Sequence, residues 1–266
     1  MLTTVLQGRP GAAPPLLIVH GLFGSARNWG VISRRLSSDR QVITVDMRNH
    51  GTSPWRSTHS YEGLAGDLAA VISMHGGQVD LLGHSMGGKA AMMLALTRPA
   101  MVRRLIVADI APVAYSHSQN HLIHAMRGLD LTDLTTRTEA DRRLSATIED
   151  PGTRAFLLQS LDLRAEPPRW RLNLDVLEAE MDRIIGWPGV ASRFEGPTLF
   201  LTGERSSYVR PEHHARITAL FPQARFETIE GAGHWLHAEK PREFEAAVAA
   251  FLADDATEEA AEAPAD

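Results

Sequence analysis

The chain has 266 residues, which is long enough for one α/β domain with an insertion, and its 44% hydrophobic content is enough to fill a core. It contains no cysteine, so disulfides, thiolate metal sites and a cysteine nucleophile are excluded, and any covalent chemistry must use oxygen or nitrogen. The formal net charge is −5, but residues 253–266 hold six acids and no base, so the rest of the chain is nearly neutral. A neutral body gives no electrostatic footprint for nucleic acid.

The two ends of the chain indicate where the protein is located and which part of it is disordered. Residues 1–7 show no basic segment followed by an apolar core of secretory length, and no apolar run in the chain approaches the roughly 20 residues of a membrane span. We therefore expect a soluble, cytoplasmic protein with no membrane partner and no nucleic-acid partner. Residues 253–266 are rich in alanine, glutamate and proline and predict an acidic disordered tail.

Short apolar or β-branched runs that end in polar residues or glycine alternate with segments of helical spacing. The predicted strands are residues 16–20, 41–46, 78–82, 105–109, 198–202 and 225–229. The predicted helices between them are residues 29–36, 61–74, 89–96, 211–220 and 241–252. This alternation predicts a mostly parallel sheet with helices on both faces, in which ligands bind beyond the carboxyl ends of the strands.

The alternation fails between residues 113 and 190. This stretch has helix-like patterns at residues 121–129, 140–148, 154–161 and 174–185 but no convincing strand. We therefore expect a core formed by residues 1–112 and 191–252, with residues 113–190 as a helical cap. Because the insertion begins at the carboxyl edge of the sheet, it is placed to roof a site there.

The stretch Gly83-His84-Ser85-Met86-Gly87 has a serine between glycines, directly after an apolar run and directly before a helical run. A strand, a tight turn and a helix in this order form a nucleophile elbow, in which a side chain at either glycine would collide with the neighbouring chain. The alternative is a glycine-rich turn with an exposed serine. The strand and helix on either side favour Ser85 as a nucleophile.

A serine hydroxyl is a poor nucleophile until a base takes its proton, and that base must be held by a third group. His234 follows the last predicted strand and two glycines, on a loop at the carboxyl edge of the sheet. A surface histidine is often only polar, but beside an elbow it is the predicted base.

Acyl transfer also needs N–H donors aimed at the developing oxyanion. Residues 20–24 follow a core strand, so the amide of Leu22 can pair with the amide of Met86, next to the nucleophile. His20 and His84 are predicted to be structural residues rather than second bases.

The acid that should hold the histidine is not at its common position in the sequence. In the common pattern G-x-x-D-x-x-V an acid follows the strand before the histidine strand, but here Ser206 stands at that position. Asp109 ends the adjacent strand, from which its carboxylate could reach His234 across one strand spacing of ~5 Å. The alternative role of Asp109 is to cap the loop backbone, and Glu204 and Asp175 are weaker candidates for the acid.

Five segments together carry a resemblance to a known family: His20-Gly21-Leu22-Phe23-Gly24-Ser25, Val45-Asp46-Met47-Arg48-Asn49-His50-Gly51, Gly83-His84-Ser85-Met86-Gly87-Gly88-Lys89, Asp109-Ile110-Ala111-Pro112-Val113 and Gly231-Ala232-Gly233-His234-Trp235-Leu236-His237-Ala238-Glu239-Lys240-Pro241. Through them, residues 15–252 resemble an α/β-hydrolase, and specifically the YbfF-type bacterial esterases and their mitochondrial relatives. The resemblance implies an eight-stranded sheet with a helical cap, and a serine esterase active on small acyl esters. It also implies that a missing acid before Tyr208 is ordinary in this group, which supports Asp109.

The predicted function is a serine carboxylesterase that hydrolyses small acyl esters through an acyl-enzyme intermediate and needs no cofactor. Ser85, Asp109 and His234 are its predicted catalytic residues. Lactone, thioester or amide hydrolysis and perhydrolysis use the same groups and stay open. A non-catalytic ligand-binding protein on a hydrolase fold also stays open, because fold does not fix function.

Three aromatic residues, Phe23, Trp187 and Trp235, are predicted to contact substrate. For Trp187, packing of the cap is an equal interpretation. The substrate partner is a small-molecule ester, and both a monomer and a homodimer stay open.

Three histidines, His117, His121 and His124, fall at spacings of four and three residues. On a helix they would share one face, as metal ligands do. No carboxylate completes a set nearby and the hydrolase interpretation needs no metal, so a polar face of the cap is favoured.

Overall fold

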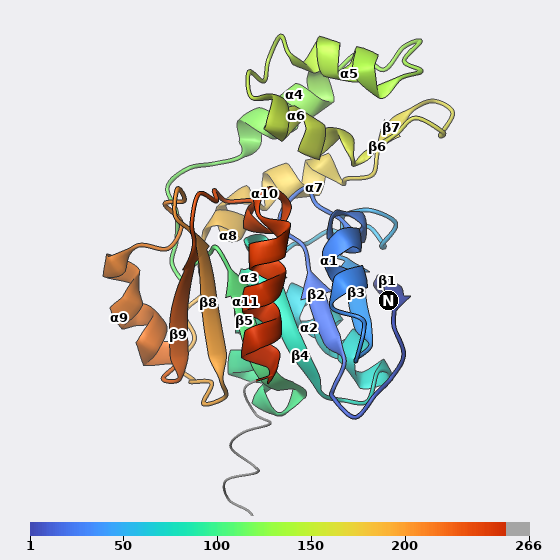
Figure 1. Cartoon of the computed structure of the whole chain (residues 1–266). Coiled ribbons are helices and arrows are strands. Elements are labelled where there is room, and N and C mark those ends of the chain that lie inside the picture. The colour runs from blue at the N-terminus through green and yellow to red at the C-terminus, as the bar shows by residue number, and fades with distance from the viewer. Residues whose placement is uncertain (254–266) are drawn as a thin grey trace, which may run out of the picture.

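The computed structural model describes residues 1–253 (Figure 1). The predicted acidic tail, residues 253–266, lies outside the described residues apart from Ala253. The strands are β1 Thr3–Gln7, β2 Leu16–Val19, β3 Val42–Asp46, β4 Val79–His84, β5 Val102–Ala108, β6 Leu161–Asp162, β7 Arg169–Trp170, β8 Thr198–Gly203 and β9 Ala224–Ile229. The α-helices are α1 Gly30–Arg35, α2 Tyr61–Met74, α3 Met86–Thr97, α4 Asn120–Gly128, α5 Arg137–Leu144, α6 Pro151–Leu158, α7 Leu174–Ala179, α8 Met181–Ile185, α9 Pro211–Leu220, α10 Leu236–Glu239 and α11 Pro241–Ala253. Two short 3-10 helices, Ala26–Trp29 and Pro99–Met101, complete the elements.

Seven strands form the main sheet, in the order β1-β3-β2-β4-β5-β8-β9. Six of them run parallel, and β1 pairs antiparallel with β3 at the edge. The resemblance implied eight strands, and that number is wrong for the described residues. Conversely, β1 was not expected, because its residues are mostly half-buried or exposed and do not form a continuous apolar run.

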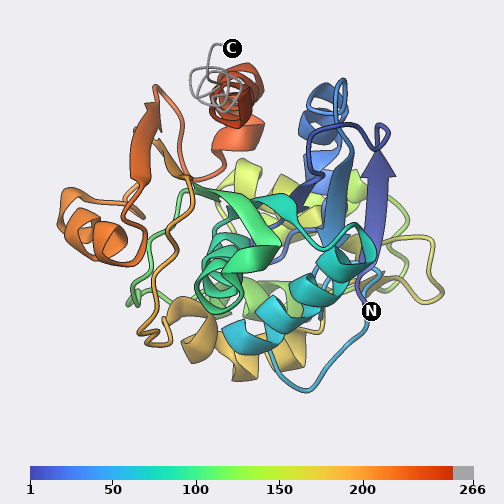
Figure 2. The same cartoon turned by 90° about the horizontal axis from the view of Figure 1, so that it is seen from below.

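Alternate residues of the central strands bury their side chains on opposite faces of the sheet. In β2, Leu16 and Ile18 belong to the buried cluster that includes residues of α1 and α11, whereas Leu17 and Val19 belong to the cluster that includes residues of α2 and α3. Figure 2 shows α1 and α11 on one side of the sheet and α2 and α3 on the other. Strands that are covered on both faces read as continuous apolar runs, which is why the sequence predicted a parallel sheet between two helical layers.

Helices α4 to α8, between β5 and β8 in the chain, form a separate layer over the carboxyl ends of the strands, which we call the cap (Figure 1). It contains α4 to α8, but also a hairpin of β6 and β7 where no strand was expected. Each of these strands has two residues, which is too short for a period-two pattern to show. The segment expected as one helix over residues 174–185 is divided at Glu180 into α7 and α8. The division into a core of residues 1–112 and 191–252 and a cap of residues 113–190 stays a prediction.

The strand order reverses beside β2, because the chain continues to β3 on one side and to β4 on the other. In open parallel sheets such a switch point makes a crevice at the carboxyl edge, where ligands bind. The loops after β2 and β4 leave the sheet at this crevice, and the loops after β5, β8 and β9 leave at the same edge. Within residues 1–253, no helix is both long and apolar enough to cross a membrane.

Candidate active site

Ser85 lies in a strained turn between β4 and α3. Its φ of +54° is in the left-handed region, which costs a non-glycine residue on the order of 1–3 kcal/mol. The turn brings two chain segments so close that a Cβ on Gly83 would lie 2.3 Å from the carbonyl oxygen of Gly87, and a Cβ on Gly87 would lie 2.4 Å from that of His20. The flanking glycines are therefore required by backbone contact, as expected for a nucleophile elbow.

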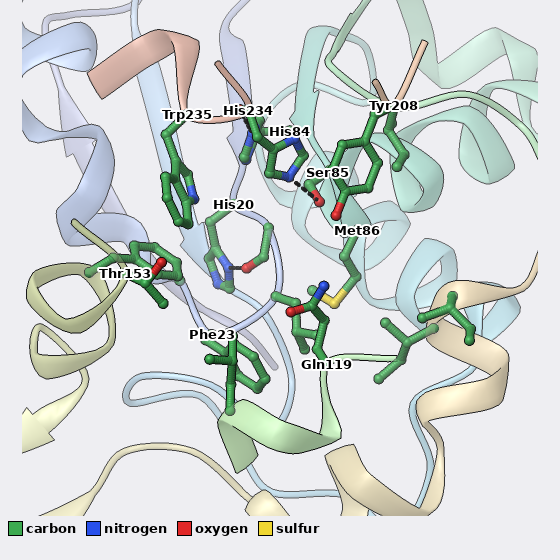
Figure 3. A pocket seen from close by; sticks show the side chains of 18 of the residues that line it. His20, Phe23, His84, Ser85, Met86, Gln119, Thr153, Tyr208, His234 and Trp235 are labelled. Carbon is green, nitrogen blue, oxygen red and sulfur yellow. Dashed lines mark hydrogen bonds between the residues drawn. The ribbon is translucent and has the colours of Figure 1, made fainter. Parts of the chain in front are cut away.

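The structure brings Ser85, His234 and Asp109 together from three loops. The Nε2 atom of His234 lies 3.1 Å from the hydroxyl oxygen of Ser85, and the Nδ1 atom of His234 lies 2.7 Å from Oδ2 of Asp109 (Figure 3 shows the first of these contacts). Because a carboxylate only accepts, Nδ1–H donates to Asp109, and Nε2 is left to accept the serine proton. This is the geometry by which an imidazole activates an alcohol.

Asp109 is fully buried and follows β5 with a φ of +52°. Besides His234, its carboxylate accepts a hydrogen bond from the hydroxyl of Ser206 and one from the amide of Gly203 at 3.2 Å. Ser206 thus stands where an acid is common and donates to the acid of the neighbouring strand. Three donors fix the orientation of the carboxylate toward the imidazole.

The two weaker acid candidates lie elsewhere. Oε2 of Glu204 accepts a hydrogen bond from the amide of Gly231 at 2.8 Å, which supports the loop that carries the histidine. The side chain of Asp175 is 91% exposed and pairs with Arg127 on the surface of the cap. In this structure neither carboxylate contacts His234.

Three neighbours hold the imidazole loop in place. His84 donates from Nε2 to the carbonyl oxygen of His234 at 2.8 Å, and Glu239 accepts from the amide of Gly233 at 2.9 Å. Burial lowers the pKa of His84 well below its ordinary value, so this ring is neutral and acts as a structural donor. The ring of Tyr208 stacks on the imidazole of His234 at 4.1 Å between centroids, a contact that the motifs did not indicate.

Two backbone amides beside Ser85 are available to an oxyanion. The N–H groups of Leu22, in the loop after β2, and Met86, at the first position of α3, have no hydrogen-bond acceptor among residues 1–253. Both residues line the same cavity as Ser85. Unpaired amides that converge on one cavity can stabilise negative charge there.

A cavity of about 480 Å³ lies over Ser85, between the core and the cap. Phe23 and Trp235 line it, as the labelled side chains in Figure 3 show. Trp187 does not line it: its ring lies 6.2 Å from that of Tyr61, where it contributes to packing. The remaining lining residues come largely from the cap and from the loops near it, including Gln119, Leu122, Ile148, Thr153, Phe156 and Tyr208. No motif could single out the cap residues, because only the packing of the cap brings them over the serine.

The three histidines considered as metal ligands do not share one helix face. Helix α4 begins at Asn120, so His117 precedes it and instead contacts the hydroxyl of Tyr208 at 2.9 Å. His124 contacts Oε1 of Glu178 at 2.5 Å on the surface of the cap.

Known proteins are similar to this chain over most of its length. Residues 14–241 match the model of the α/β hydrolase fold family. The chain belongs to that family. It is 39% identical over 245 residues to the esterase YbfF of Escherichia coli (strain K12), covering 90% of this chain and 93% of the relative. It is 42% identical over 249 residues to the sn-1-specific diacylglycerol lipase ABHD11 of Mus musculus, covering 90% and 81%.

A solved structure of a marine microorganism esterase superposes with a TM-score of 0.89 at 39% identity, covering 94% of this chain and 98% of the other. These matches confirm the predicted α/β-hydrolase fold and the YbfF-type resemblance. They also confirm the predicted class of activity, that of a serine hydrolase acting on ester bonds.

Proposed function

We propose that this α/β-hydrolase cleaves small carboxylic esters with Ser85 as nucleophile, His234 as general base and acid, and Asp109 as the residue that orients the imidazole. The observation that carries the proposal is the unbroken series of hydrogen bonds from the serine hydroxyl through the imidazole to a buried carboxylate, at 3.1 Å and 2.7 Å. Ester hydrolysis is the activity class of the relatives, and these contacts supply its chemistry.

The reaction follows from the positions of these groups. As the oxygen of Ser85 attacks the ester carbonyl carbon, Nε2 of His234 takes the hydroxyl proton and the carbonyl oxygen becomes an oxyanion. The amides of Leu22 and Met86 bind this oxyanion. The carbon–oxygen bond to the alcohol then breaks, and His234 returns the proton to the leaving alcohol. A water, deprotonated by the same imidazole, releases the acid and regenerates the serine.

The cavity supports a small, uncharged ester as substrate. Its volume of about 480 Å³ is within the range of drug-sized ligand sites, and most of its lining is apolar. Among the described residues that line it, Lys89 is the one lysine, and it already donates to the carbonyl oxygens of Ile185 and Gly186, at 2.9 Å and 2.6 Å. The other charged lining residues, histidines aside, are Glu149 and Asp150, which disfavour an anionic substrate.

Several finer features stay predictions. Lactones, thioesters, amides and peracid formation use the same groups, and the mouse relative is named for diacylglycerol. A substrate screen should therefore include acyl chains of increasing length, a lactone, a thioester and a diacylglycerol. A cytoplasmic location, the lack of membrane and nucleic-acid partners, and the choice between monomer and homodimer also stay predictions.

The proposal is tested by replacing the nucleophile. We expect Ser85→Ala to abolish turnover of a chromogenic short-chain ester, because the acyl-enzyme cannot form without the hydroxyl. Thermal unfolding and circular dichroism should show an unchanged fold. Undiminished turnover by the folded variant would refute the proposal.

A further inference from the structure

The loop that supplies the Leu22 amide contains a strained residue, Phe23. Its φ of +64° is in the left-handed region, although it has a large, buried side chain. The amide of Gly24 donates to the carbonyl oxygen of Gly21 at 3.0 Å and closes a tight turn around Leu22 and Phe23. A phenylalanine in this conformation costs on the order of 1–3 kcal/mol, so other contacts must hold the turn in place.

Both peptide groups of Phe23 are held by side chains from distant parts of the chain. Its amide donates to Nε2 of His50 at 3.1 Å, and its carbonyl oxygen accepts from the hydroxyl of Ser160 at 2.9 Å. His50 lies in the loop after β3, whereas Ser160 follows α6 in the cap. Phe23 is thus hydrogen-bonded to a core residue through its amide and to a cap residue through its carbonyl oxygen.

The tautomer of His50 is set by its two neighbours. A backbone amide can only donate, so Nε2 accepts from Phe23, and Nδ1–H donates to the carbonyl oxygen of Arg48 at 2.9 Å. His50 is fully buried, and burial lowers its pKa well below the ordinary value, so the ring is neutral. It is therefore a fixed acceptor for the Phe23 amide.

The two hydrogen bonds to Phe23 also restrict the orientation of the Leu22 amide. The peptide that contains the Leu22 N–H has the Gly21 carbonyl oxygen at its other end, which accepts from Gly24 and lies 2.7 Å from Nδ1 of His20. The next peptide contains the Phe23 N–H, which His50 holds. Because the turn has only two central residues, rotation of the second peptide would also rotate the first, and with it the Leu22 N–H.

We propose that His50 and Ser160 are positioning residues for the esterase reaction: by holding the two peptide groups of Phe23, they keep the Leu22 amide aimed at the oxyanion and couple the cap to catalysis. This inference rests on the proposed function, because it assigns a supporting role around the same oxyanion site. Neither side chain exchanges a proton with substrate.

The test for His50 compares two substitutions that differ in whether an acceptor remains. His50→Leu removes it, whereas His50→Gln offers an amide oxygen in its place. We expect His50→Leu to lower kcat by about tenfold to a hundredfold with KM changed less than threefold, since loss of a whole oxyanion donor costs about 10²–10³. His50→Gln should recover most of that loss. Equal kcat for the two variants, or an effect confined to KM, would overturn the proposal.

Ser160→Ala tests the cap side and avoids a large change at a buried ring. A matched control is Ser192→Ala, because the hydroxyl of Ser192 donates to the carbonyl oxygen of Leu96 at 2.6 Å, at the far end of α3 from Ser85. We expect Ser160→Ala to lower kcat several-fold and Ser192→Ala to leave kcat unchanged. If the two serine variants behave alike, the cap does not position the loop.

An alkyl boronic acid provides a readout that a purely structural role would not move. It forms a tetrahedral adduct on serine, with an oxygen where the oxyanion develops. We expect its inhibition constant to rise in His50→Leu and Ser160→Ala by the same factor by which kcat/KM falls, and an unchanged constant would contradict the proposal. If the wild type hydrolyses esters and depends on Ser85, but neither variant alters kcat, this inference fails while the proposed function stands.

Discussion

At the scale of residues, the carboxylate that contacts His234 follows a different strand from the one that carries the acid in the common pattern. Asp109 follows β5, and Ser206, in the loop after β8, donates to its carboxylate. A buried carboxylate needs donors for both oxygens, and a serine at the vacated position supplies one of them. The arrangement keeps a carboxylate in contact with His234 although the usual position holds no acid.

This arrangement predicts a ranking among three acids. Asp109→Asn should lower kcat by about 10³–10⁴-fold, because an asparagine amide favours the wrong tautomer of the imidazole. Glu204→Gln and Asp175→Asn should have much smaller effects, since neither side chain contacts His234. Turnover of one chromogenic ester by the three variants measures the ranking, and a larger loss for either control would reassign the acid.

Local sequence patterns predict some of the residues around this site and not others. Ser85 and His234 could be predicted because glycines and a neighbouring strand mark each position, and Asp109 because its strand is adjacent. The stacking of Tyr208 on His234 could not be predicted, since it depends on how two loops converge. Trp187 was expected to contact substrate, but its flanking Gly186 and Pro188 do not reveal which side of the chain faces the cavity.

At the scale of elements, the contact at Gly87 sets how closely the first turn of α3 approaches the end of β2. A Cβ on Gly87 would lie 2.4 Å and 2.5 Å from the carbonyl oxygens of His20 and Val19. These atoms belong to the backbone of a buried strand end and cannot move cheaply. The absence of a side chain at this position therefore fixes where the nucleophile sits.

Gly87→Ala should consequently destabilise the protein by about 1–3 kcal/mol, the usual cost of overpacking, despite the better helix propensity of alanine. Gly66→Ala in α2 is the matched control, because a Cβ there would meet no atom of the described residues within 4 Å, apart from the backbone of its own helix. The control should be neutral or stabilising by up to about 1 kcal/mol. Urea midpoints measure both. Equal midpoints for the two variants would show that the close approach at the elbow is not required.

The elements with long or strongly patterned segments were predictable, and the short ones were not. Six core strands and the helices between them follow from apolar or β-branched runs and from helical spacing. Strand β1 was missed because its five residues, Thr3–Gln7, do not form a continuous apolar run. The hairpin of β6 and β7, with two residues in each strand, and the division between α7 and α8 depend on contacts within the cap.

At the scale of the whole molecule, five of the described histidines are buried near the carboxyl edge of the sheet. Burial lowers the pKa of each of them, to about 3 for His59 and His237, and they are His20, His50, His59, His84 and His237. In the unfolded chain each would have an ordinary pKa near 6.5. Below that pH the unfolded chain binds more protons than the folded protein, so unfolding becomes more favourable.

The free energy of unfolding should therefore decrease as the pH falls from about 6.5, by up to about 1.4 kcal/mol per pH unit for each such histidine, and this source of loss should vanish above that pH. Urea unfolding at pH 7 and pH 5 measures the slope. His237→Phe should flatten this slope, since the Nδ1 atom of His237 has no hydrogen-bond partner among residues 1–253 and its ring stacks on Trp29. His121→Gln, at an exposed site, is the control. If His237→Phe and His121→Gln give the wild-type slope alike, the buried imidazoles do not set the acid sensitivity.

The layered architecture and the place of the cap over the carboxyl edge could be inferred from the order of elements along the chain. The volume and lining of the cavity could not, because they depend on how side chains of the cap pack against the core. The ester that fits the cavity is therefore identified by a substrate screen rather than by a motif.

The central claim is that Ser85 is an activated nucleophile. A fluorophosphonate probe tests it most directly, since the probe reacts with an activated serine and mass spectrometry identifies the modified residue. We expect one label per chain at Ser85, loss of esterase activity in proportion to labelling, and suppressed labelling in His234→Ala. Labelling at another residue, or full activity after complete modification of Ser85, would contradict the claim.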